Sequence, residues 1–141
     1  MAAGDFYFAI NATFRFFLEN YGEEALHRYW TAMGKEYFEP LSRRFQAGGL
    51  PEVEKYWTEF FETEPGGEVE VTRSNDRVEI EVKKCPALFW LRDHDREEVA
   101  CYCRHCEFVS KEIASNSGLS FELEGGGGAC HQTFIGEEGA S

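Results

Sequence analysis

The sequence is poor in positive charge. It has 14 lysines and arginines against 26 aspartates and glutamates, so its formal net charge at pH 7 is -12. A protein that binds nucleic acid or an anionic membrane surface needs a basic face that displaces counterions, and the deficit excludes both partners. An anionic small molecule is still compatible with local cations. Five of these lie near the cysteine-bearing segments: Lys83, Lys84, Arg92, Arg96 and Arg104.

Long hydrophobic runs are also missing. No stretch approaches the roughly 18 uncharged apolar residues that a membrane-spanning helix requires. The first residues carry no basic run, and the apolar stretch after them is interrupted by Asn11, Thr13 and Arg15, which is not the pattern of a signal peptide. We therefore expect a soluble, cytoplasmic protein.

Internal repeats are absent, and the only low-complexity element is the four-glycine run at residues 125–128. A length of 141 residues is typical of one domain. We expect a single domain over residues 1–141, with a helical half at 5–64 and a sheet with a cysteine-rich helix at 67–136. Aromatic residues make up 16% of the chain, enough to build the core and to wall a small-molecule pocket.

Helical periodicity dominates the first half. One apolar stripe with steps of three or four predicts a first helix that ends near Gly22. Its members are Phe6, Ile10, Phe14, Phe17 and Tyr21. A second stripe runs from Leu26 to Leu41, with Pro40 expected to bend or end that helix and Gly48-Gly49 to close the segment. A third, shorter helix is predicted around Trp57.

Strand periodicity follows residues 65–67. Apolar residues alternate with polar ones over 69–71 and 78–82, and Ser74-Asn75-Asp76 supplies a turn, which predicts an antiparallel hairpin. Two further strands are expected at 119–123 and 131–135. Between them, Asp95 and Glu98 have the spacing of a capping box, which predicts a helix running to Ser117 and carrying the cysteine cluster. The fold class is α+β, with the N-terminal helices on one face of an antiparallel sheet of about four strands.

Five cysteines are concentrated in the second half of the chain. Dense thiols in a reducing compartment are more often ligands or nucleophiles than disulfides. Cys103 and Cys106 form a C-x-x-C pair, which is half of a common zinc site. Cys85 together with Cys130, or with His131 in its place, would complete tetrahedral coordination by zinc or another transition metal. Two alternatives stay open: buried thiols that act as small hydrophobic residues, and a reactive thiol or thiol pair.

The histidines and glycines near the cysteines supply further candidates. Cys130 and His131 are neighbours in a predicted strand and point to opposite faces, so a Cys–His pair must join different segments. The combinations to consider are Cys106 with His131 and Cys130 with His105. The glycine run offers successive amide donors, at Gly126, Gly127 and Gly128, that are suited to binding a carboxylate.

Three segments carry a resemblance to a known family. They are Cys85-Pro86 with Trp90-Leu91, Tyr102-Cys103-Arg104-His105-Cys106, and the glycine-rich stretch that closes on Cys130. Together they resemble the bacterial 2-aminothiazoline-4-carboxylic acid hydrolase family over residues 10–135.

This resemblance implies the hydrolytic opening of a small sulfur–nitrogen ring bearing a carboxylate, with a carbamoyl derivative of cysteine as the product. The enzyme would then be a hydrolase acting on a non-peptide carbon–nitrogen bond. In this scheme Cys106 is a catalytic thiol and His105 or His131 carries the proton, because histidine titrates near neutrality. Arg104 and the glycine amides would hold the substrate carboxylate.

A more distant similarity is to 4-vinyl-reductase-type sensory domains. It implies a small-molecule-binding module in which the aromatic helices enclose an apolar ligand and the cysteines hold a structural zinc. Such a module would form a homodimer through its N-terminal helices.

Overall fold

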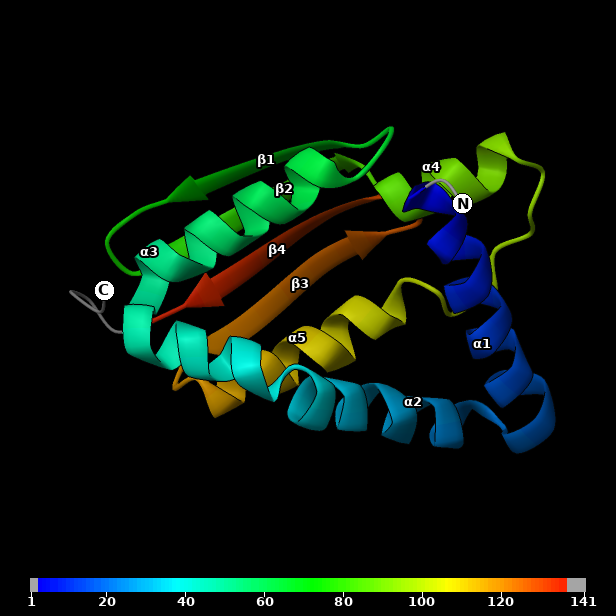
Figure 1. Cartoon of the computed structure of the whole chain (residues 1–141), viewed down its shortest axis with the longest axis horizontal. Coiled ribbons are helices and arrows are strands. Elements are labelled where there is room, and N and C mark those ends of the chain that lie inside the picture. Colours follow the sequence, from blue (N-terminus) through cyan, green and yellow to red (C-terminus); the bar gives the residue numbers. More distant parts are fainter. Residues whose placement is uncertain (1–2, 137–141) are drawn as a thin grey trace.

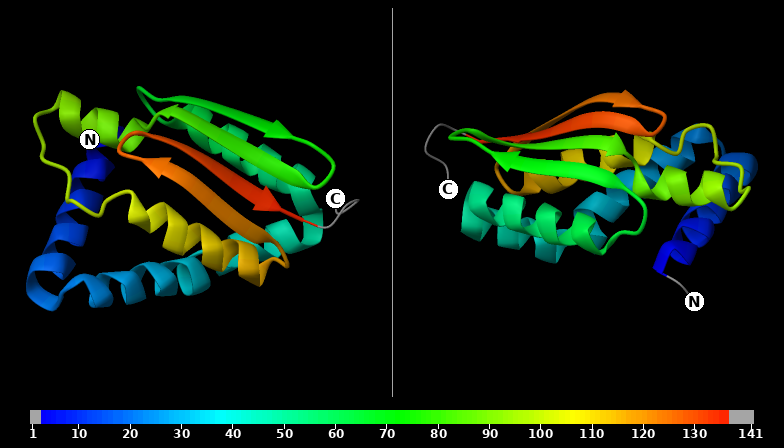
Figure 2. Two further views of the ribbon diagram at one scale, coloured as in Figure 1. Left: turned by 180° about the vertical axis from the view of Figure 1, so that it is seen from behind. Right: turned by 90° about the horizontal axis from the view of Figure 1, so that it is seen from above.

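The computed structural model of the chain describes residues 3–136 and has the predicted α+β fold. The four strands of the described residues form one antiparallel sheet in the order β1-β2-β4-β3. Their bounds are β1 (Glu68–Arg73), β2 (Arg77–Lys84), β3 (Ser120–Gly126) and β4 (Ala129–Ile135). Helices cover one face of this sheet and leave the other face open (Figures 1 and 2).

The first two helices follow the predicted periodicity closely. After a short 3-10 turn (Ala3–Asp5), α1 (Phe6–Tyr21) ends as expected at Gly22, whose φ of 88° favours glycine. Helix α2 (Glu23–Ala32) begins directly afterwards and runs into a single π-helical turn (Met33–Tyr37). Gly34 in this turn packs so closely against α5 that a Cβ atom at this position would lie 2.6 Å from the Val109 carbonyl oxygen.

Helix α3 (Glu39–Thr63) agrees with its prediction in part. Pro40 does not end a helix but stands in the first turn of α3, where its missing N–H costs nothing. The glycine pair closes the first part of α3, as predicted. Gly49, with a φ of 67° and a ψ of -156°, is not helical, and a second helical part follows it through the segment predicted as a third helix.

Both hairpins form where the sequence places turn residues. The β1–β2 turn is closed by the Ser74 N–H, which donates to the Arg77 carbonyl at 2.9 Å. The β3–β4 turn uses Gly127 and Gly128, with φ values of 68° and 118°. Tight two-residue hairpins need positive φ at their central residues, so the glycine run is a turn.

The cysteine-bearing helix starts later than predicted. Helix α5 spans Arg104–Asn116, whereas the capping-box pattern placed its start near Asp95. Asp95 has a φ of 53°, and Glu98 pairs with Arg92. Asn11 on α1 binds this segment by accepting the Val99 N–H at 2.9 Å, so a long-range contact overrides the local signal.

A helix that was not predicted, α4 (Pro86–Asp93), precedes this connection. Cys85 is its N-cap residue and Pro86 occupies its first turn. Cys101 and Cys103 lie ahead of α5, and only Cys106 lies within it.

The core lies between the sheet and the helices. Side chains of β2, β3 and β4 meet α2, α3, α4 and α5 in one continuous buried cluster. Its largest fully buried members include Trp30, Phe45, Phe134, Leu26, Ile80 and Leu88. Among the described residues, no helix is both long and apolar enough to cross a lipid bilayer.

Candidate functional site

Four of the five cysteines gather at one end of the sheet. Cys85 follows β2, Cys103 and Cys106 stand at the start of α5, and Cys130 belongs to β4. Burial, and after it the nearby thiols of Cys106 and Cys103, raise the pKa of both Cys85 and Cys130. All four are half-buried free thiols. The fold thus brings together the four residues predicted as metal ligands.

The donor geometry of this cluster is not that of a preformed zinc site. Within residues 3–136, no three side chains of histidine, cysteine, aspartate or glutamate are arranged to hold one metal ion. Burial raises the pKa of Cys85 and of Cys106 to about 11, so both are protonated thiols in the metal-free protein. The zinc site stays a prediction from the sequence.

Cys103 lies against the glycine turn. Burial raises the pKa of its thiol, an effect that the backbone amides of Gly127 and Gly128 oppose without reversing it. Arg92 stands beside it, since Cys103 is one of the groups that raise the pKa of that guanidinium, after the larger effect of Glu98. Arg92 also donates to the Gly127 carbonyl at 3.1 Å. The amides of Gly127 and Gly128 therefore lie against the Cys103 sulfur. The carboxylate contact at Gly126, Gly127 and Gly128 stays a prediction from the sequence.

Cys106 has a histidine as its immediate neighbour. The Cys106 sulfur lies 3.6 Å from the His105 Nε2 atom. His105 Nδ1 lies 2.6 Å from the Tyr102 carbonyl oxygen, so Nδ1 carries the proton and Nε2 is free to accept one. Burial lowers the pKa of His105. The resting pair is a neutral imidazole beside a protonated thiol, and it differs from both predicted pairings.

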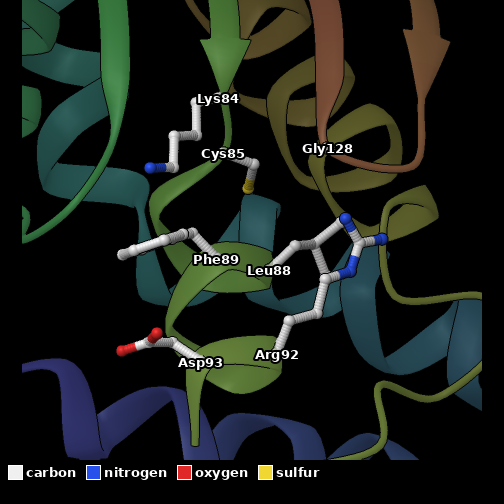
Figure 3. Close-up of a pocket in the computed structure, with 7 residues that line it drawn as sticks. All are labelled: Lys84, Cys85, Leu88, Phe89, Arg92, Asp93 and Gly128. Atoms are coloured by element: carbon white, nitrogen blue, oxygen red, sulfur yellow. The ribbon is translucent and has the colours of Figure 1, made fainter.

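A pocket opens beside the thiol cluster (Figure 3). Its volume is about 360 Å³, a size suited to a small molecule. The lining residues are Lys84, Cys85, Leu88, Phe89, Arg92, Asp93 and Gly128. In Figure 3 the Arg92 guanidinium extends towards Gly128, and Lys84 lies on the other side of Cys85. The ammonium of Lys84 lies 3.6 Å from the centroid of the Phe89 ring.

Two basic residues line this pocket, Lys84 and Arg92, and the predicted Arg104 is not one of them. Arg104 is exposed, lies 3.9 Å from Glu107 and covers the ring of Phe108, so it does not line the pocket. The sequence pattern alone does not distinguish Arg92 from the other basic residues near the cysteines. The spacing between Cys85 and Arg92 becomes informative once Pro86 is recognised as the first residue of a helix, because that helix places Leu88, Phe89 and Arg92 on neighbouring turns.

Two tyrosines and a glutamate near the cluster were missed entirely. The Tyr7 hydroxyl of α1 donates to the carboxylate of Glu64, the residue that follows α3. Burial, and next this hydrogen bond, raise the pKa of Tyr7, which also lies within electrostatic range of Cys85 and Tyr102. These residues come from distant segments, and no local motif marks them.

His131 lies on the opposite face of the sheet. Its ring bonds Glu81 through Nδ1 and Glu79 through Nε2, the latter at 3.1 Å. The register places Glu124 of β3 directly across from it as well. Cys130, the neighbour of His131, faces the helices and accepts a bond from the Gln132 amide at 3.5 Å. The predicted pairing of His131 with Cys106 is therefore not formed.

The position of His131 makes its titration predictable. Hydrogen bonding to Glu81, and next to Glu79, raises the pKa of His131. Because the folded-state pKa is raised, the stability that this group contributes is complete below the unfolded value of about 6.5 and is lost as pH rises through the folded pKa.

An NMR titration of the His131 imidazole should give a pKa above 6.5. Glu81→Gln should lower that pKa and the exposed control Glu19→Gln should leave it unchanged, whereas an unshifted histidine would contradict the assignment.

Comparison with protein-family models and with curated proteins gives no match for this chain. The function must therefore be argued from the site itself.

Proposed function

We propose that the protein is a hydrolase that opens a small sulfur–nitrogen heterocycle bearing a carboxylate, of the 2-aminothiazoline-4-carboxylate type, to a carbamoyl derivative of cysteine. The observation that supports this proposal is the shared wall between the pocket and the thiol cluster. Cys85, Arg92 and Gly128 line the pocket. The Gly128 amide also lowers the pKa of Cys103, and Cys103 in turn raises the pKa of Arg92.

The pocket offers contacts that match such a substrate. Lys84 and Arg92 line the pocket beside one carboxylate, Asp93, so the lining carries a net positive charge in a chain whose net charge is -12. The Arg92 Nε atom donates to the Glu98 carboxylate at 2.6 Å, so a bound substrate carboxylate shares the guanidinium with Glu98. Leu88 and Phe89 supply apolar contact for the ring. In this assignment Arg92 and Lys84 take the role that the family resemblance implies for Arg104.

Cys103 is the nucleophile in the proposed reaction. Its thiolate adds to the ring carbon between nitrogen and sulfur, and the ring carbon–nitrogen bond then breaks as the departing nitrogen takes a proton. Water attacks the same carbon next and displaces the Cys103 thiolate, which leaves the carbamoyl product and returns the free thiol. The Cys106 thiol and His105 Nε2 form the nearby pair that supplies and recovers the proton.

The role of Arg92 is tested by its replacement with glutamine. We expect kcat/KM for 2-aminothiazoline-4-carboxylate to fall about 10- to 100-fold, because a charge-assisted hydrogen bond contributes about 1.5 to 3 kcal/mol. Steady-state kinetics measure the change, with circular dichroism to confirm the fold. Arg104→Gln is the matched control, since that side chain is exposed and does not line the pocket. Equal losses in the two variants would count against the assigned pocket.

A small-molecule-binding or sensory module is the second candidate, and the convergence of four thiols favours it. In that case zinc would be held entirely by the cysteines and its removal by a chelator would unfold the protein. A hydrolase with a thiol nucleophile would keep its fold under the same treatment and lose turnover on alkylation. The proposed homodimer would use exposed apolar side chains of α1: Phe6, Ile10, Phe16 and Tyr21.

A further inference from the structure

The C-x-x-C pair stands at the first turn of α5. Cys103 is the N-cap residue, and its φ of -66° and ψ of -19° are already helical. The preceding backbone also turns helically, because the Arg104 and His105 amides donate to the carbonyls of Cys101 and Tyr102 at 3.0 and 3.3 Å. Residues three apart in such a turn have Cα atoms about 5 Å apart. Disulfides span Cα distances of about 4.4 to 6.8 Å, so this backbone accommodates one without rearrangement of the fold.

The two sulfurs have different neighbours, which suit them to different roles in disulfide exchange. Cys103 lies next to the glycine turn and to Arg92, a residue that lines the pocket, so we assign it the attacking role. Cys106 lies 3.6 Å from His105 Nε2, which is unprotonated and so can accept the thiol proton when the second sulfur attacks. The remaining thiols of the cluster, Cys85 and Cys130, lie on other elements and share no helical turn with either sulfur.

We propose that Cys103 and Cys106 form a redox-active dithiol that closes reversibly to an intramolecular disulfide by exchange with a small, carboxylate-bearing disulfide. We expect the small disulfide to be an anion, because Lys84 and Arg92 line the pocket beside Cys103. Cys103 attacks one sulfur of the small disulfide and releases one thiol. Cys106 then attacks the Cys103 sulfur of the mixed disulfide and releases the second thiol. Two protein thiols are oxidised and one disulfide is reduced to two thiols, with the Cys106 proton passing through His105.

Closure has a direct consequence for the site. The disulfide consumes the sulfur of Cys103 and that of Cys106, so hydrolysis stops until a thiol reductant reopens the pair. This consequence rests on the proposed hydrolase function, whereas formation of the disulfide does not.

The test uses the full chain equilibrated in buffers of reduced and oxidised glutathione, acid-quenched, alkylated and mapped by peptide mass spectrometry. We expect one disulfide joining Cys103 to Cys106 in the wild type, and a glutathione adduct on Cys103 that persists in the Cys106→Ala variant. Cys101→Ala is the matched control and should close like the wild type. A wild type that stays fully reduced, or a disulfide that uses Cys85, Cys101 or Cys130, overturns the proposal.

Turnover of 2-aminothiazoline-4-carboxylate is measured on the same samples. Activity that disappears on closure and returns with dithiothreitol supports both assignments. A disulfide that forms in a protein with no hydrolytic activity in the reduced state supports the dithiol and overturns only the hydrolase. Full activity in protein whose Cys103 and Cys106 are completely paired overturns the role of closure as an off state.

Discussion

Replacing Cys103 with alanine is expected to lower kcat for 2-aminothiazoline-4-carboxylate by about a thousandfold or more, because removal of a nucleophile eliminates the covalent route. The prediction follows from the position of the sulfur, next to the amides of the glycine turn and the Arg92 guanidinium. Initial rates under substrate saturation give kcat directly. Circular dichroism and thermal unfolding establish whether the variant keeps the wild-type fold.

Cys101→Ala is the control for this experiment. Cys101 lies two residues away, and its pKa is raised mainly by burial and further by Glu23, a residue outside the thiol cluster. This variant should retain wild-type kcat. A Cys103→Ala protein that folds and turns over at a wild-type rate would remove Cys103 from the mechanism and leave Cys85, at the N-cap of α4, as the next thiol to test.

Truncating Phe134 to alanine is expected to lower the free energy of unfolding by about 3 to 5 kcal/mol, the usual cost of a phenylalanine cavity in a core. Phe134 is 0% exposed. Its ring lies 6.1 Å from that of Phe45, 6.0 Å from that of Trp57 and 5.0 Å from that of Phe121. It therefore joins α3 to two strands of the sheet, and urea denaturation monitored by fluorescence measures the loss.

Phe6→Ala makes the same chemical change at a site that is 61% exposed. Its effect should stay within about 0.5 kcal/mol, as is usual for surface substitutions. Comparable losses of unfolding free energy in the two variants would mean either that the Phe134 ring is not central to the core or that Phe6 is buried in an oligomer. Measuring the oligomeric state of the protein would separate these explanations.

The candidate site is built from backbone as much as from side chains. The Cys85 amide donates to the Gly128 carbonyl at 2.8 Å, which ties the start of α4 to the β3–β4 turn. Arg92 then binds that turn from the far end of the same helix. The turn is held on both sides, so its two amides keep their position against Cys103.

Local patterns predicted those parts of the fold that depend on local forces. The stripe from Phe6 to Tyr21 marks α1 because side chains three and four apart share a helix face. Gly22 marks the end of α1 because its positive φ suits glycine. The alternation around Ser74–Asp76 marks the first hairpin, since neighbouring residues of a strand face opposite sides of the sheet. The grouping of cysteines also pointed correctly to one thiol-rich region.

What the sequence by itself determined is therefore the α+β class, the strands, the first helices and the identity of the clustered thiols. Tertiary structure decided where α5 begins, because Asn11 binds the backbone at Val99, 88 residues away, and keeps residues after Asp95 out of a helix. It also decided that Arg92 lines the pocket and that His131 pairs with glutamates on the open sheet face. Contacts of this kind join segments far apart in the chain, and a local pattern carries no information about which distant group will supply the partner.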